Sequence, residues 1–208
     1  MKANAALLDS LNTFIHFPMN LVQKSHVLLR DFFCNNSPKI AVDATLGRGR
    51  DALFLFESLA DGGILYGFDV QKAALEESRS LINSLPCSSR KKFNFFLESH
   101  SNMHFLLPLD CRGNVNAICF NLGWLPKSDK TITTSAHSTL SALEGALNLI
   151  NPENFALSVL SYRGHSGGME ECATVGDFFS NNFPHAEIFG DFENPISPVL
   201  FFASNKNI

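Results

Sequence analysis

Seven short apolar runs rich in β-forming residues alternate with longer stretches of helical period along this 208-residue chain. The runs lie at residues 39–45, 63–70, 92–99, 115–121, 154–162, 186–192 and 198–204. Strands that alternate with helices predict a mostly parallel α/β sheet with helices on both faces. Only residues 193–197 separate the last two runs, too few for a helical crossover, so these runs predict a C-terminal antiparallel hairpin.

Helical period is expected in five stretches. They cover residues 20–33, 51–59, 71–85, 139–150 and 170–181. In the fourth of these, Leu140, Leu143, Leu147 and Ile150 lie on one apolar stripe. The length suits one domain with a full-sized core. We therefore predict a single domain over residues 1–208, with an N-terminal helical segment (1–35) and a core (38–204).

Composition narrows the class of protein. With 45% hydrophobic and 17% charged residues the chain reads as globular, and its net charge of −4 provides no global basic field for nucleic acid. Any RNA contact must therefore come from a local patch. The five cysteines form no CxxC pair, which indicates neither a zinc site nor a disulfide framework but buried thiols in a reducing cytoplasm. No run approaches the roughly 20 apolar residues of a membrane span.

The first strand is predicted to end in a glycine turn that binds a ligand. In VDATLGRGRD, Asp43 ends the strand, Gly47 and Gly49 form the turn, and Asp51 begins the next helix. Glycines allow a sharp bend and a close approach of the ligand to the backbone. Asp69 ends the second strand 20 residues after Gly49, a spacing that suits the ribose hydroxyls of an adenosine cofactor. The alternative role for Asp69 is to cap the N-terminus of the helix predicted to follow it.

Two features favour S-adenosylmethionine over NAD. Ala52 stands where a GxGxxG turn would place its third glycine. The Asp43 carboxylate is unfavourable beside a pyrophosphate but favourable beside the ammonium group of a methionine moiety. A nucleotide-binding oxidoreductase remains the alternative from a different class.

The NLGW stretch that follows the fourth strand belongs at the same edge of the sheet. The Asn121 amide and a neighbouring carbonyl can accept hydrogen bonds from an amino group, and Trp124 can stack on a base or lie against a positively charged methyl group. The stretch resembles the Asn/Asp-Pro-Pro-aromatic turn of amino-group methyltransferases. The alternative is an ordinary turn with a packed tryptophan.

A second polar block, YRGHSGGMEE, follows the fifth strand. Methyl transfer needs an amine with a free lone pair, and Tyr162 or His165 can accept a proton or orient the amine. Glu170 and Glu171 are predicted to be first-turn acids favoured by the helix dipole.

The chain resembles the rRNA methylase family of class I methyltransferases over roughly residues 20–203. The resemblance lies in SHVLL, VDATLGRGRDALFL, YGFDVQ, ESHSNM, FNLGWLPKSDKTITT and YRGHSGGMEE. It implies a Rossmann-like seven-stranded fold, S-adenosylmethionine as cofactor, a homodimer, and methylation of the aminomethyl group of the wobble 2-thiouridine in tRNA. It places the cofactor beside Asp43, Thr45, Gly47, Gly49, Asp51, Asp69, Val70, Gln71, Ser99, His100 and Asn121. Ser99 and His100 would lie by the adenine, and Asn121 by the methionine end.

On the substrate side, a small basic rim and several hydroxyls are expected to contact the anticodon region of tRNA. The residues are Trp124, Leu125, Pro126, Lys130, Thr133, Thr134 and Arg163, with Lys127 and Arg48 adding charge. Unpaired bases are read by stacking, for which Trp124 is suited. Methylation of rRNA, DNA or a small amine stays open, as does a non-catalytic RNA-binding module.

Overall fold

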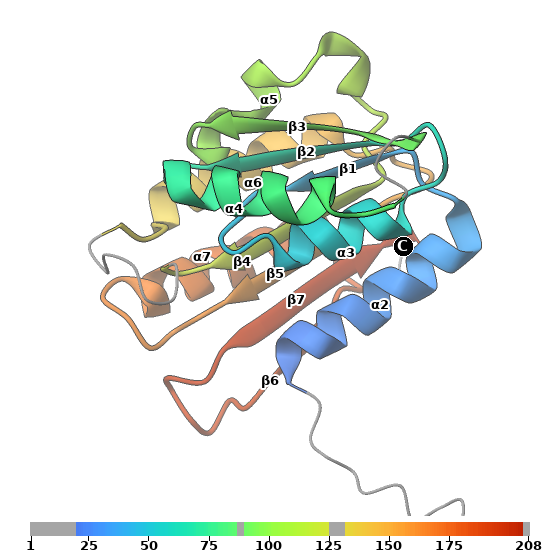
Figure 1. Ribbon diagram of the computed structural model, residues 1–208. Coiled ribbons are helices and arrows are strands. Elements are labelled where there is room, and N and C mark those ends of the chain that lie inside the picture. Colours follow the sequence, from blue (N-terminus) through green and yellow to red (C-terminus); the bar gives the residue numbers. More distant parts are fainter. Residues whose placement is uncertain (1–19, 87–89, 125–131, 206–208) are drawn as a thin grey trace, which may run out of the picture.

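Seven strands of the described chain form one sheet, in the order β3-β2-β1-β4-β5-β7-β6 (Figure 1). The computed structural model describes residues 20–86, 90–124 and 132–205. The strands are β1 (Ile40–Asp43), β2 (Ile64–Asp69), β3 (Lys92–Leu97), β4 (Ala117–Leu122), β5 (Ala156–Ser161), β6 (Glu187–Gly190) and β7 (Val199–Ser204). Neighbours from β3 to β5 pair in parallel, whereas β7 is antiparallel to both β5 and β6. The predicted sheet and its C-terminal hairpin are confirmed.

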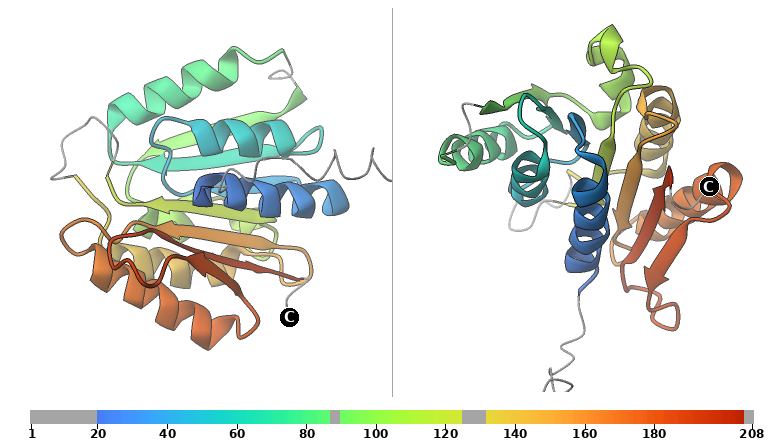
Figure 2. Two further views of the ribbon diagram at one scale, coloured as in Figure 1. Left: turned by 90° about the horizontal axis from the view of Figure 1, so that it is seen from below. Right: turned by 90° about the vertical axis from the view of Figure 1, so that its right-hand side faces the viewer.

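Helices cover both faces of the sheet (Figure 2). One face carries α2 (Leu21–Asn36), α3 (Arg50–Ser58) and α4 (Lys72–Asn83), and the other α5 (Met103–Leu106), α6 (Ala136–Leu149) and α7 (Gly168–Asn182). Two short 3-10 turns, η2 (His100–Asn102) and η3 (Leu109–Cys111), precede and follow α5. Because side chains alternate along a strand, each strand supplies apolar residues to both layers. No helix in the described ranges has the length and apolar character to cross a bilayer.

The apolar stripe predicted for α6 is correct for Leu143 and Ile150, which are buried, and wrong for Leu140 and Leu147, which are 36% and 38% exposed. The other buried side chains of the helix include Ala142, Ala146 and Leu149. Small residues face inward because α6 packs closely against both α7 and η2.

The N-terminal helix α2 begins and ends with local signals. The Asn20 side chain accepts the Gln23 backbone N–H at 2.9 Å, and the Gln23 side chain accepts the Asn20 N–H at 3.2 Å. At the other end Ser37 adopts a left-handed conformation (φ 48°). The Ser25 and Ser158 hydroxyls, 2.7 Å apart in the interior, join α2 to β5. Residues 1–19 of the predicted N-terminal segment lie outside the described residues.

The turn after β1 has the sharp bend that its glycines predict. Gly47 and Gly49 adopt φ values of 51° and 72°. The Leu46 N–H donates to the Phe68 carbonyl at 3.0 Å, which ties the turn to the end of β2. Since the chain order reverses between β1 and β4, the carboxyl ends of these strands flank a crevice, where open α/β sheets bind ligands.

Replacing Gly49 with alanine is expected to destabilise the protein by about 2–4 kcal/mol, because a left-handed conformation and a steric overlap both oppose the new methyl group. A Cβ at Gly49 would lie 2.8 Å from the Ser78 Cα atom. Gly113 is the matched control, because it has a φ of +67° but no described atom lies within 4 Å of the position that an added Cβ would take. Gly113→Ala should cost only about 1–2 kcal/mol. Equal losses in urea unfolding would show that α4 yields to the methyl group.

Candidate active site

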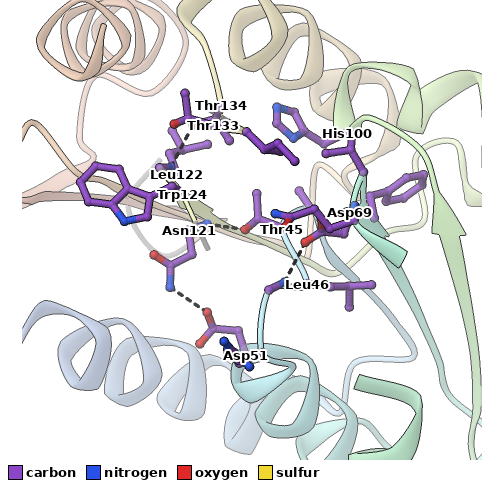
Figure 3. Close-up of a pocket in the computed structure, with 18 of the residues that line it drawn as sticks. Thr45, Leu46, Asp51, Asp69, His100, Asn121, Leu122, Trp124, Thr133 and Thr134 are labelled. Carbon is purple, nitrogen blue, oxygen red and sulfur yellow. Dashed lines mark hydrogen bonds between the residues drawn. The ribbon is translucent and has the colours of Figure 1, made fainter. Parts of the chain in front are cut away.

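A cavity of about 690 Å³ opens at the carboxyl ends of the central strands (Figure 3). This volume lies within the range of small-molecule sites. Most of the predicted site residues line it: Thr45, Gly47, Asp51, Asp69, Val70, Gln71, Ser99, His100, Asn121, Trp124, Thr133, Thr134 and Tyr162. Residues at the ends of five strands therefore lie together around this cavity.

Asp69 connects the glycine turn with the start of α4. Its Oδ2 accepts the Gly47 N–H at 2.9 Å, and its Oδ1 accepts the Gln71 N–H at 2.9 Å. Burial raises the pKa of Asp69, and the backbone hydrogen bonds from Gln71, Gly47 and Val70 oppose that rise. Asp69 is not the N-cap of α4, which is Gln71, but it holds the backbone of the glycine turn and of Gln71 and also lines the cavity.

At the β3 end of the cavity, burial lowers the pKa of His100 to about 4, so the imidazole is neutral at physiological pH. Its Nε2 has no hydrogen-bond partner among the described residues. Ser99 begins the turn into η2, because its hydroxyl accepts the Ser101 N–H at 3.3 Å. The site therefore offers a neutral ring and a hydroxyl beside the strand that carries Asp69.

Asn121 is held at both its backbone and its side chain. Its N–H donates to the Thr45 hydroxyl at 2.7 Å, which fixes the end of β4 against the end of β1. Its Nδ2 donates to Asp51 Oδ2 at 3.1 Å. A carboxylate only accepts hydrogen bonds, so the amide nitrogen must face Asp51 and the amide oxygen must turn away from it (Figure 3). Among the described residues, none donates a hydrogen bond to that oxygen.

The segment after β4 is anchored by a buried acid. Trp124 and Thr133 form an antiparallel bridge. The Thr134 hydroxyl accepts the Gly123 N–H at 2.9 Å and donates to Glu171 Oε2 at 2.9 Å. Glu171 is fully buried and also accepts a hydrogen bond from the Thr139 hydroxyl at 2.6 Å.

This anchoring corrects two predictions from the sequence. The Thr134 hydroxyl is used inside the protein rather than free for a phosphate contact, and Glu171 is more than a first-turn helix acid. Sequence reasoning missed the role of Glu171. Only Thr134 and Thr139, which flank the helix cap Ser135, could have indicated that role. Glu171 follows them in the sequence by 37 and 32 residues, so the sequence does not show that they share it as a partner.

Tyr162 and His165 differ in their relation to the cavity. Tyr162 lines it, and burial followed by the charge of Asp51 raises the tyrosine pKa, so the phenol keeps its proton at neutral pH. His165 is not among the residues that line the cavity, and its side chain is 6% exposed. Its ring lies against Trp124, with centroids 5.2 Å apart at an interplanar angle of 86°. Tyr162 is thus suited to donate a hydrogen bond, and His165 to support Trp124.

Asp43 and Gly49 lie beside the cavity rather than in its lining. Asp43 is 1% exposed, and its Oδ1 accepts the Thr45 N–H at 3.0 Å. Burial first, and the charge of Asp51 second, hold the pKa of Asp43 well above its usual range. Its Oδ2 has no partner in the described part of the chain. The carboxylate that reaches the cavity from this side is therefore that of Asp51.

Arg163 does not take the position expected of a substrate contact. Its guanidinium donates to the backbone carbonyls of Asp191, Asn194 and Ser197, so it holds the loop between β6 and β7. The predicted contacts Leu125, Pro126 and Lys130, together with Lys127, lie outside the described residues. Of the expected basic rim, Arg48 lines the cavity and pairs with Glu77 at 2.9 Å.

The strand order, the reversed last strand and the cavity at the switch between β1 and β4 define a class I, Rossmann-like methyltransferase fold. The family described as "Putative rRNA methylase" matches residues 65–188, more than half of the chain. The chain belongs to this rRNA methylase family. This family match does not favour a nucleotide-binding oxidoreductase, the alternative function that the glycine turn allowed.

Relatives of known sequence or structure agree with this assignment. The chain is 35% identical over 171 residues to a chloroplastic tRNA (mnm(5)s(2)U34)-methyltransferase of Arabidopsis thaliana; the match covers 77% of this chain but only 61% of that relative. A "putative rRNA-methylase" of Clostridium thermocellum superposes with a TM-score of 0.75 at 26% identity, covering 89% of this chain and 97% of that one. An rRNA methylase of Streptococcus thermophilus gives 0.63 at 28% identity, with 87% and 94% covered.

Proposed function

We propose that this protein is an S-adenosylmethionine-dependent methyltransferase that acts on tRNA, at the aminomethyl group of a wobble 5-aminomethyl-2-thiouridine. The observation that carries the proposal is the Asn121 amide in the cavity wall, whose nitrogen is bound to Asp51 and whose oxygen is turned away from Asp51, near Trp124. The Arabidopsis relative is named for methylation of a uridine at tRNA position 34. An amide acceptor and an aromatic face suit an amine carried on a planar base.

The residues of the cavity fit the proposed cofactor. Asp69 has a carboxylate for ribose hydroxyls, and neutral His100 and Ser99 lie on the side assigned to the adenine. The buried Asp43, with one oxygen lacking a described partner, lies beside the cavity near the position assigned to the methionine ammonium, and the Asp51 carboxylate lines the cavity there. When bound, the cofactor supplies a methyl group on a positively charged sulfur. The protein's own contribution is to hold the amine in line with that methyl group.

The RNA side of the proposal depends on local groups, because the net charge is −4. Arg48 and Arg50 both line the cavity and can meet phosphate near its mouth. Trp124 can stack on an unpaired anticodon base. A homodimer, which the family resemblance implies, stays a prediction that sedimentation velocity can check.

Nucleoside mass spectrometry tests the proposed reaction. tRNA bearing 5-aminomethyl-2-thiouridine is incubated with the protein and isotopically labelled S-adenosylmethionine. We expect one labelled methyl group on the wobble uridine and none on tRNA that lacks the aminomethyl group. Cofactor binding without label on the tRNA would contradict the substrate assignment and direct the search to other amines. Absence of cofactor binding would contradict the methyltransferase assignment.

Cofactor affinity is expected to fall on mild acidification. The pH at which it falls should be higher than the pKa of an ordinary aspartate. Burial raises the pKa of Asp69. Ribose hydroxyls donate to the ionised carboxylate, so the affinity is fully present above this raised pKa and is lost as the pH falls through it. Calorimetric titrations from neutral pH downward measure the effect, with Asp69→Asn as the control that should flatten the dependence. Wild-type affinity that does not change with pH would contradict the assignment.

A further inference from the structure

The groups that could remove a proton from the substrate amine form a chain from the cavity toward the surface. An alkylamine is mostly protonated at neutral pH and has no lone pair in that form. Tyr162 keeps its proton, and His165 does not line the cavity. Asp51 does line it, and the Asp51 carboxylate lies 3.1 Å from the amide nitrogen of Asn121 (Figure 3). Asp51 is thus the carboxylate at the nitrogen end of the amide whose oxygen an amine would contact, and both residues line the same cavity.

The second oxygen of Asp51 contacts His26 on α2. The His26 Nε2 atom lies 2.6 Å from Asp51 Oδ1. The imidazole stacks on Phe54, with ring centroids 4.2 Å apart and an interplanar angle of 5°, so the ring plane is fixed. The His26 side chain is 24% exposed and that of Asp51 12% exposed. The His26–Asp51 pair is therefore held in place by packing against Phe54 and is partly accessible to solvent.

The negative charge at this wall of the cavity comes from Asp51 itself, because the acidic groups around it are shifted toward their neutral forms. Burial first, and the charge of Asp51 second, raise the pKa values of Asp43 on β1, Cys119 on β4 and Tyr162 after β5. Two arginines lie near the pair. Arg30 lies over the Phe54 ring, 5.7 Å from its centroid, and Arg50 lines the cavity next to Asp51 in the sequence. Asp51 thus provides the carboxylate that a cationic ligand can contact at this wall of the cavity.

We propose that Asp51 is the group that accepts the proton of the substrate ammonium, and that His26 is a positioning residue that holds the Asp51 carboxylate toward the amine. The inference rests on the proposed function. One ammonium proton moves to an Asp51 oxygen and leaves a neutral primary amine. Its lone pair forms the new C–N bond with the methyl carbon while the C–S bond breaks, and that electron pair stays on sulfur. The product is a protonated secondary amine with S-adenosylhomocysteine, and Asp51 returns its proton to water.

Two features of the arrangement favour this transfer. An ammonium beside a sulfonium loses its proton more readily, because like charges repel. The Asn121 amide oxygen can accept a hydrogen bond from one of the two N–H groups that remain on the amine. This contact orients the lone pair of the amine toward the methyl group. Asp51 thereby serves both groups: it fixes the amide that orients the amine and accepts the proton that blocks the lone pair.

The test is the pH dependence of single-turnover methyl transfer to aminomethyl-bearing tRNA. At neutral pH we expect Asp51→Asn to slow the transfer by about 100-fold or more, the scale of general base catalysis. The variant should recover about tenfold per pH unit on the alkaline side, because the free amine then needs no acceptor. His26→Gln, which keeps a donor, should lose less than His26→Leu. Glu76→Gln removes an exposed charge on α4 outside the cavity and should behave as wild type.

A second measurement does not depend on turnover. With S-adenosylhomocysteine present, Asp51→Asn should bind aminomethyl-bearing RNA about tenfold more weakly than wild type, on the scale of one charged contact. Both proteins should bind the same RNA without the aminomethyl group equally well. If the wild type is active and the Asp51→Asn variant has the same pH profile, the proposed role of Asp51 is overturned and the proposed function is kept. A wild type that methylates no aminomethyl-bearing RNA would overturn this inference together with the proposed function.

Discussion

Replacing Asn121 with alanine is expected to lower the rate of methyl transfer by about 10³-fold, the scale of removing one preorganised polar group from a reaction centre. The side chain provides the amide oxygen for the amine, and its nitrogen is bound to Asp51. The backbone N–H of residue 121 should still donate to Thr45, so the end of β4 stays in place. Single-turnover kinetics with saturating RNA and cofactor measure the loss.

Asn116 provides the matched control for that experiment. This buried amide lies just before β4 and accepts the backbone N–H groups of Lys39 and Ile40 at 2.9 Å and 3.1 Å. Asn116→Ala should therefore lower the free energy of unfolding and leave the rate per folded molecule near wild type. Asn121→Ala should show the opposite pattern, with a large loss of rate and near-normal thermal stability. A rate for Asn121→Ala within tenfold of wild type would remove this amide from the mechanism.

Replacing Asp69 with alanine is expected to weaken cofactor binding by about 1.5–3 kcal/mol, the scale of a hydrogen bond to a charged group. That loss corresponds to roughly a 10- to 150-fold rise in Kd. Part of it will come from the protein itself, because the carboxylate also accepts the N–H groups of Gly47 and Gln71. Calorimetry with S-adenosylmethionine measures the change directly.

Comparison with Asp69→Asn separates the two contributions. Asparagine keeps one acceptor oxygen for the turn but loses the charge and the second acceptor, so its affinity should lie between those of wild type and the alanine variant. Thermal melting without cofactor reports the contribution of the turn. Unchanged affinity in Asp69→Ala would leave Asp69 as a structural link between the glycine turn and Gln71, and would remove it from the cofactor site.

The general plan of the fold was predictable because its signals are local. The strand runs, the helical period, and the short link between β6 and β7 depend on neighbouring residues, and each appears in the structure. The position of the site was also predictable. Gly47 and Gly49 adopt the positive φ values that the turn requires, and parallel strands present their carboxyl ends at one edge.

Other features depended on which elements pack together. Leu140 and Leu147 satisfied a helical period yet face outward, since the contacts with α7 and η2 chose the buried face of α6. Arg163 was expected at the substrate, but three carbonyls of the β6–β7 loop hold its guanidinium. Periodicity and charge alone do not distinguish these outcomes, because each partner lies far away in the sequence.

The sequence by itself determined the class of fold, the glycine turn, and the placing of Asn121 and Asp69 at one edge of the sheet, because these follow from periodicity and backbone conformation. Only the tertiary structure decided how the side chains at that edge are used. Asn121 and Asp51 are 70 residues apart and His26 precedes Asp51 by 25, so only the packing of α2 and α3 against the sheet brings the three together. That packing fixes which end of the amide faces a ligand.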